Sequence, residues 1–148
     1  MAQTLTCLLV HAVFSTKDRA PLIKPELETD LFAYVGAVCK NSRSPLLAAG
    51  GTNDHVHLLI SLNKNVTLPD LMLPLKRDSS RWMREHGASR FRWQDGYAGL
   101  TVGMSQVPTL RAYFAKQKSK HKKMTYQEEL LALLKKYEVE YDERFLWD

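Results

Sequence analysis

The segment at residues 53–62, NDHVHLLISL, restricts this chain most, because two histidines flank a valine and apolar sequence follows. Side chains of an extended strand alternate between two faces, so Val56 and Leu58 would share one face while His55 and His57 share the other. Paired imidazoles can converge on one divalent ion, but strand histidines can equally bond to backbone or water. The pattern therefore predicts a half-apolar strand and leaves a metal site open.

Apolar periodicity and turn residues predict the order of the other elements. Residues 4–14 are apolar on both strand faces, which is typical of a central strand. The turn sequence that begins at Gly50 leads directly into the histidine strand, which predicts a hairpin, and Thr67 can cap a helix. Expected strands span 4–14, 45–49, 53–62 and 91–103, and expected helices span 25–41, 67–87, 105–122 and 126–137.

The order strand, helix, strand, strand, helix, strand matches a ferredoxin-like fold, an α+β fold with an antiparallel sheet. Two additional C-terminal helices remain, and we expect them to cover the sheet face that carries the histidines. A length of 148 residues with 45% hydrophobic content suits one domain over 1–148. The longest apolar stretch near the start is about half of the ~20 residues that span a bilayer, which predicts a cytoplasmic protein without a membrane segment.

A formal net charge of +5 permits an anionic partner, and the placement of the charge says more. Basic residues crowd two of the expected helices, which we expect to lie beside the candidate metal site. Such runs of basic residues usually form a solvated helix face. Contact with nucleic acid is the more specific hypothesis. The residues concerned are Lys76, Arg77, Arg81 and Arg84 in one helix and Arg111, Lys116, Lys118, Lys120, Lys122 and Lys123 in the other.

The basic helix at 105–122 also contains a tyrosine and a glutamine at helical spacing. Tyr113 and Gln117 are four residues apart and so lie on one helical face, with His121 one further turn along. A tyrosine offers an oxygen nucleophile, and a glutamine carbonyl can complete a coordination sphere that imidazoles begin. His11, on the first strand, could approach the same site, but a lone strand histidine is more often structural.

Several motifs together give the chain a family resemblance. They are HAVFSTKDR, GGTNDHVHLLISL, LKRDSSRWM, FRWQDGYAGLTVG, YFAKQKSKH and YDERFLWD. In these motifs the chain resembles the single-tyrosine HUH transposases of the smallest bacterial and archaeal insertion sequences, the IS200-like transposases. The resemblance implies that Tyr113 is the catalytic nucleophile and that His55, His57 and Gln117 bind Mg²⁺ or Mn²⁺.

The implied activity is cleavage and rejoining of single-stranded DNA at hairpin-flanked element ends, through a 5′-phosphotyrosine intermediate. The implied assembly is a homodimer in which the tyrosine helix is shared between protomers. Two alternatives stay open: a domesticated relative that processes repeated chromosomal hairpins, and a non-catalytic nucleic-acid-binding module. The DNA contacts we expect are Lys76, Arg77, Arg81, Arg84, Lys116, Lys120 and His121.

Overall fold

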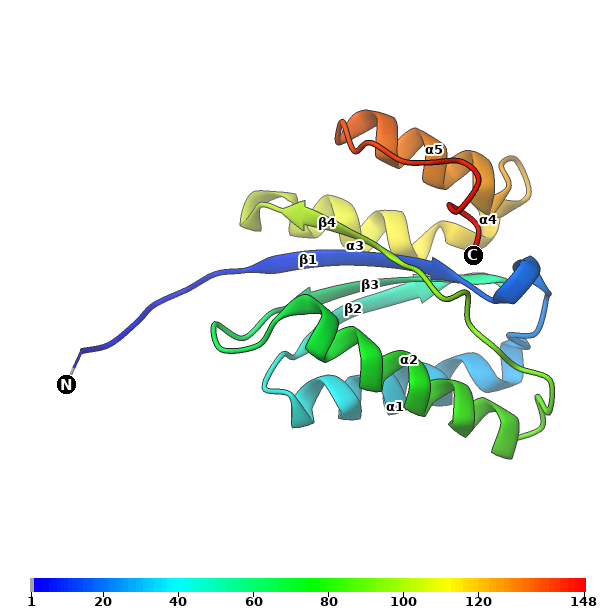
Figure 1. Ribbon diagram of the computed structural model, residues 1–148, viewed down its shortest axis with the longest axis horizontal. Coiled ribbons are helices and arrows are strands. Elements are labelled where there is room, and N and C mark those ends of the chain that lie inside the picture. Colours follow the sequence, from blue (N-terminus) through cyan, green and yellow to red (C-terminus); the bar gives the residue numbers. More distant parts are fainter. Residues whose placement is uncertain (1) are drawn as a thin grey trace.

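The computed structural model describes residues 2–148 and has three layers (Figure 1). A four-stranded antiparallel sheet in the order β2-β3-β1-β4 lies between two layers of helices, as expected for the ferredoxin-like α+β fold. Helices α1 and α2 cover one face, and α3, α4 and α5 lie on the other (Figure 1). The strands are β1 (Leu9–Ser15), β2 (Leu46–Gly51), β3 (His55–Ser61) and β4 (Ala98–Val102); the helices are α1 (Pro25–Asn41), α2 (Leu68–Glu85), α3 (Val107–Ala115), α4 (Gln117–His121) and α5 (Tyr126–Lys136).

The two central strands, β1 and β3, are apolar because helices cover the sheet on both sides. Val56, Leu58 and Ile60 of β3 pack in the larger core with residues of α1 and α2. Leu59 points the other way and packs with Phe114 of α3. The alternation predicted for the histidine strand is therefore confirmed, and it places both imidazoles under the C-terminal helices.

The first strand is shorter than the predicted range of 4–14. Leu9 is the first residue of its ladder, paired with Ser61 on one side and Val102 on the other. Both neighbouring strands end at these residues, and the pairing with β3 continues before Leu9 only through one hydrogen bond, from the N–H of Leu62 to the carbonyl of Leu8. Leu5 is 79% exposed, which shows that the apolar pattern there does not mark buried strand.

The predicted strand at 91–103 is also shorter, because only 98–102 pairs along β4. The preceding segment meets the sheet through a single bridge between Trp93 and Thr16. The ammonium of Lys76 donates hydrogen bonds to the carbonyls of Gln94, Asp95 and Gly96, at 2.7, 2.9 and 2.6 Å. A charged donor from α2 thus satisfies three carbonyls that have no strand partner, which fixes the irregular segment.

Two of the helices begin at threonine caps. Thr67 accepts a hydrogen bond from the backbone N–H of Asp70, as predicted for α2. Thr125 does the same for Glu128, whose carboxylate accepts in return from the backbone N–H of Thr125. This capping box fixes the start of α5, and with it the direction in which its first turn projects side chains.

The predicted tyrosine helix at 105–122 is not continuous. It begins with a 3-10 turn at Met104–Gln106, runs as α3, and is interrupted at Lys116 before α4. The interruption separates the turn that carries Tyr113 from the turn that carries Gln117. Gln117 is 1% exposed, whereas its basic neighbours Lys116, Lys118, Lys120 and His121 are exposed or partly exposed.

Among residues 2–148, no helix is both long enough and apolar enough to cross a membrane.

Candidate active site

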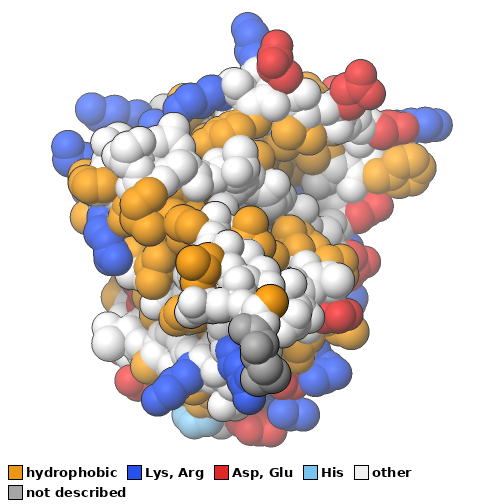
Figure 2. Space-filling view, turned by 90° about the vertical axis from the view of Figure 1, so that its left-hand side faces the viewer, with side chains coloured by type: hydrophobic (Ala, Val, Ile, Leu, Met, Phe, Trp, Pro, Cys, Tyr) orange, Lys and Arg blue, Asp and Glu red, His pale blue; other side chains and the backbone are white. Residues whose placement is uncertain are grey.

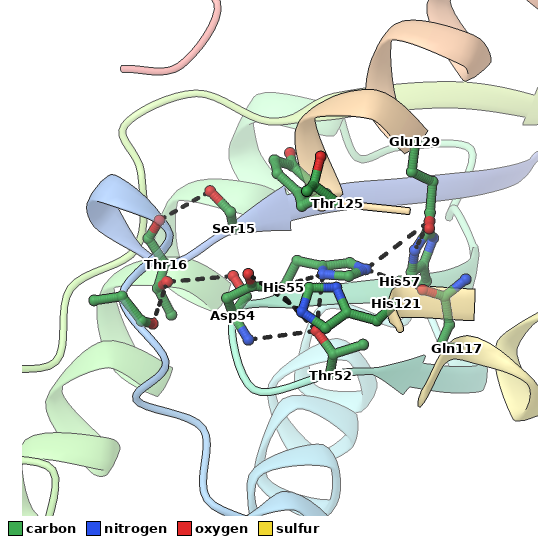
Figure 3. Close-up of polar contacts among 12 residues, drawn as sticks. Ser15, Thr16, Thr52, Asp54, His55, His57, Gln117, His121, Thr125 and Glu129 are labelled. Atoms are coloured by element: carbon green, nitrogen blue, oxygen red, sulfur yellow. Dashed lines mark hydrogen bonds and ion pairs between the residues drawn. The ribbon is translucent and has the colours of Figure 1, made fainter. Parts of the chain in front are cut away.

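The two histidines of β3 lie at the centre of a buried polar cluster (Figure 3). His55 and His57 are both fully buried, and their ring centroids are 5.2 Å apart. Each ring directs its Nε2 atom toward side chains from the C-terminal helices. The shared strand face predicted from sequence therefore brings two nitrogen donors to one place.

Different partners hold the other ring nitrogens. Nδ1 of His55 lies 2.7 Å from Oδ1 of Asp54 and 2.9 Å from the hydroxyl of Thr52. Nδ1 of His57 lies 2.8 Å from Nε2 of His11 on the neighbouring strand. Burial, together with the nearby His57, lowers the pKa of His11 to about 3, so this ring is neutral near pH 7. Partners on Nδ1 orient a ligand histidine and leave its Nε2 lone pair for a metal.

Gln117 completes the arrangement that the sequence predicted. Its Oε1 atom lies 2.9 Å from Nε2 of His55, a contact between residues 62 positions apart. Tyr113 lies one turn earlier, half-buried, with its ring edge-on to His57 at a centroid distance of 5.5 Å. The structure therefore brings together all four residues that the resemblance assigns to the reaction centre.

A fifth residue enters from α5 and has no counterpart in the sequence predictions. Glu129 is 2% exposed, and its Oε1 atom lies 2.6 Å from Nε2 of His57 (Figure 3). Burial alone would raise the pKa of Glu129, but the contact with His57 and the nearby His55 outweigh it and lower that pKa to about 2. Glu129 is therefore a buried carboxylate anion. A glutamate in the first turn of an amphipathic helix is ordinary in sequence, so no local signal could have found it.

Hydrogen bonding gives an independent test of whether these residues suit a cation. Both carboxylate oxygens of Glu129 and Nε2 of His57 are buried without a hydrogen-bond partner, although Oε1 and Nε2 lie only 2.6 Å apart. Buried polar atoms are rarely left unpartnered, and a divalent ion among them would satisfy all three. Two imidazoles, an amide oxygen and a carboxylate are also donors that Mg²⁺ or Mn²⁺ accepts.

The surroundings of Tyr113 oppose its ionisation. Burial raises the pKa of its hydroxyl above the usual value, and the negative charge of Glu129 raises it further. Lys120 supplies the nearest compensating charge, with its ammonium 5.0 Å from the centre of the tyrosine ring. A positive charge between Tyr113 and Glu129 would offset the contribution of Glu129 to this raised pKa.

The basic residues divide between the two faces of the sheet. Lys116, Lys120 and His121 belong to the layer that covers the histidines, and His121 lies 3.7 Å from Asp54. The basic residues of α2 lie on the opposite face, so the expectation that both clusters flank the metal site was wrong for this set. Sequence clustering could not show this, because the side of the sheet is set by the chain connection.

Three of the four α2 residues border a groove, whereas the guanidinium of Arg81 lies 3.6 Å from the carboxylate of Asp78. A cavity of about 610 Å³ lies between α2 and the irregular segment before β4, lined by Lys76, Arg77 and Arg84 together with Arg92 and Tyr97. Arg84 is partly engaged, because its guanidinium donates to the hydroxyl of Ser80 and the carbonyl of Phe91. The four DNA contacts predicted on α2 remain predictions, and the structure gives the ammonium of Lys76 backbone partners.

A close approach of α3 to the sheet sets the position of Tyr113 and gives a stability prediction. A Cβ atom on Gly50 of β2 would lie 2.6 Å from the carbonyl oxygen and 2.8 Å from the Cβ of Phe114. Gly50→Ala must therefore push α3 away, and we expect a loss of about 1–3 kcal/mol in the free energy of unfolding. Urea denaturation would measure it.

Gly36→Ala is the matched control, because a Cβ at Gly36 in α1 would meet nothing closer than 3.8 Å. Alanine favours a helix interior over glycine, so this variant should gain about 0.5–1 kcal/mol. Equal stability of the two alanine variants would contradict the close packing of α3.

The fold and the site define a protein of the α+β class, with a buried histidine pair, a glutamine amide and a tyrosine gathered on one sheet face. Comparison with protein-family models gives a match to "Transposase IS200 like" over residues 4–117, most of the chain. The chain belongs to this family of IS200-like transposases, the single-tyrosine HUH transposases that its motifs resemble. A search of curated proteins gave no match.

Solved structures show the same fold. A crystal structure of a candidate transposase from Deinococcus radiodurans R1 is 23% identical, with a TM-score of 0.63, and the match covers 79% of this chain and 95% of that one. A REP-associated tyrosine transposase bound to a REP hairpin is 11% identical, with a TM-score of 0.60, and the match covers 82% and 72% of the two chains. At these identities the likeness establishes the fold.

Proposed function

We propose that this transposase cleaves and rejoins single-stranded DNA at hairpin-flanked element ends, through a 5′-phosphotyrosine formed on Tyr113. The observation that carries the proposal is the position of Tyr113 against His57, with Gln117 one turn further at hydrogen-bonding distance from His55. A nucleophile beside a set of metal-ligating atoms is the arrangement that metal-assisted phosphoryl transfer requires. His55, His57 and Gln117 would hold Mg²⁺ or Mn²⁺.

Each proposed transfer exchanges one phosphoester for another. The phenolic oxygen of Tyr113 forms a bond to phosphorus as the bond from phosphorus to the 3′ oxygen breaks. The phenolic proton leaves, and the departing 3′ oxygen becomes a hydroxyl. A bound divalent ion supplies Lewis-acid polarisation of the scissile phosphate. A 3′-hydroxyl can later attack the phosphotyrosine, so strands rejoin without ATP.

The chain has two basic surfaces that could hold the DNA. Lys116, Lys120 and His121 stand beside the reaction centre, where phosphates flanking the scissile bond would lie. The groove along α2, with Arg77 and Arg84, offers a second surface on the other side of the sheet. The REP hairpin bound by one structural neighbour supports a hairpin as the ligand.

A covalent-adduct assay tests this function. Purified protein would be incubated with Mn²⁺ and single strands labelled at their 3′ ends, because the 5′-phosphotyrosine keeps the DNA on the 3′ side of the break. The strands would come from the genomic flanks of its own gene and from repeated hairpins elsewhere in the chromosome, and the products would be separated under denaturing conditions. We expect a labelled protein band with the strand that contains the hairpin and none with its complement. A complete absence of adduct on every flank strand would contradict the proposed reaction. Adducts only with repeated hairpins elsewhere in the chromosome would identify the domesticated alternative, whereas binding without adduct would identify a binding module.

We also propose that the working enzyme is a homodimer. A strand exchange between two element ends needs two nucleophiles, and a symmetric pair supplies them. Figure 2, which faces the end from which the N-terminal segment emerges, shows hydrophobic side chains among lysines and arginines on this surface. Leu5 and Leu8 of the N-terminal segment are 79% and 45% exposed. Apolar exposure of this kind supports association with a second copy.

The resemblance favours exchange of the tyrosine helix between protomers, whereas in the single chain described here α3 packs on its own sheet. Residues 103–106, which connect β4 to α3, are all exposed. If this connection led α3 to a partner's sheet instead, these residues would therefore lose no buried surface. Mixing a His55→Ala, His57→Ala chain with a Tyr113→Phe chain tests the exchange. We expect each mixed dimer to regain one of its two sites and cleave DNA. Inactivity of every mixture, with mixed dimers verified by mass, would place the whole site within one chain.

A further inference from the structure

Glu129 reaches the histidine pair from α5, a helix beyond the residues 4–117 that match the family model. The capping box at Thr125 fixes the first turn of this helix, and Figure 3 shows the Glu129 side chain pointing from α5 toward His57. Its carboxylate is 2% exposed, so solvent barely reaches it. Burial of an anion is costly unless a strong partner compensates for it.

The partners present do not fully compensate for this charge. Neither carboxylate oxygen of Glu129 has a hydrogen-bond partner, although Oε1 lies 2.6 Å from Nε2 of His57. An unpartnered carboxylate, nearly fully buried and aimed at two nitrogen donors, points to a cation between them.

Distances between the donor atoms support this reading. Oε1 of Glu129 lies 2.6 Å from Nε2 of His57 and 3.9 Å from Nε2 of His55, which in turn lies 2.9 Å from Oε1 of Gln117. In an octahedral site with metal–ligand bonds of about 2.1 Å, adjacent donors lie about 3.0 Å apart and opposite donors about 4.2 Å. The observed separations fall near this range, and one donor atom from each of His55, His57 and Glu129 lies within 4.8 Å of the others.

Charge gives a further reason. Two imidazoles and an amide form a neutral ligand set, and neutral nitrogen donors do not favour a hard ion such as Mg²⁺ or Mn²⁺. One carboxylate adds the negative oxygen donor that these ions prefer. Without the ion, the negative charge of Glu129 opposes ionisation of Tyr113. A bound divalent ion would offset that charge.

We propose that Glu129 is a fourth protein ligand of the metal ion, so that α5 completes the set of protein ligands and metal binding fastens this helix over the site. The inference rests on the proposed metal site of His55, His57 and Gln117. If Glu129 merely occupied the place of the ion, it would compete with the metal, and its removal would strengthen metal binding. If Glu129 is a ligand, its removal would weaken metal binding.

Calorimetric titration of the full chain with MnCl₂, without DNA, tests the proposal. Glu129→Gln keeps the size of the side chain and removes its charge, and we expect it to weaken Mn²⁺ binding at least about tenfold, since even partners outside the coordination sphere have effects of this size. Glu128→Gln is the matched control: the residue is adjacent and exposed, and glutamine can keep the capping box. It should bind Mn²⁺ as the wild type does.

The outcomes are separable. Unchanged or tighter Mn²⁺ binding by Glu129→Gln would overturn the ligand role of Glu129. Unchanged binding by the His55→Ala, His57→Ala chain would instead overturn the metal site on which the proposal rests. Circular dichroism would check the fold of each variant. Should Glu129→Gln not fold, Glu129→Asp keeps the charge on a shorter side chain and should also weaken binding, and wild-type affinity in that variant would overturn the proposal.

Discussion

Tyr113→Phe is expected to abolish DNA cleavage and covalent adducts while leaving affinity for hairpin DNA within a few fold of the wild type. The substitution removes only the attacking oxygen and keeps the ring that packs against His57. Loss of a nucleophile lowers the rate by several orders of magnitude, on the order of 10⁴ or more. Denaturing electrophoresis would measure the adduct, and a filter-binding titration would measure affinity.

Tyr34→Phe provides the matched control for this variant. Tyr34 belongs to α1, on the other side of the sheet, where its ring stacks on Trp82 at a centroid distance of 5.8 Å. Loss of its hydroxyl should leave cleavage unchanged. Wild-type cleavage by Tyr113→Phe would show that another group attacks phosphorus.

The double variant His55→Ala, His57→Ala is expected to lose both Mn²⁺ binding and metal-dependent cleavage. Both rings supply Nε2 donors to the centre, so their removal leaves an amide and a carboxylate, too few ligands for tight binding. Calorimetry with MnCl₂ and the adduct assay would measure the two losses. Treatment of the wild type with EDTA should likewise stop cleavage.

The same variant should still fold, with a reduced free energy of unfolding. The apolar face of β3 is unchanged, but Asp54 and His11 lose their imidazole partners in a buried place. We expect a loss of about 1–3 kcal/mol for each buried group left unpaired. His86→Ala is the control, since His86 is exposed at the end of α2 and should change neither Mn²⁺ binding nor cleavage.

Local features of the sequence sufficed to predict much of this fold. The period of two in HVHLLIS predicted which side chains of β3 face the larger core, because alternation follows from strand geometry alone. Thr67 predicted the start of α2, because a cap bonds to a backbone group only three residues away. The four-residue spacing of Tyr113 and Gln117 predicted that both lie near the histidines. This holds despite the interruption at Lys116, because the chain is helical on both sides of that residue.

Contacts between elements decided the rest. The length of β1 depends on where β3 and β4 end. The side of the sheet that α2 covers depends on its connection to β3. The local sequence pattern therefore predicts neither feature.

The sequence by itself pointed to the histidine pair, the tyrosine and the glutamine, through their spacing and through the family resemblance of the motifs that contain them. Only the tertiary structure decided the surroundings that set their chemistry: Asp54 and His11 behind the rings, and Glu129 in front of them. Glu129 is an ordinary helical glutamate in sequence, and it becomes a buried carboxylate without a hydrogen bond, beside His57, because α5 folds back over the sheet. Burial and charge pairing are properties of groups that meet in space, so they appear only when the chain has folded.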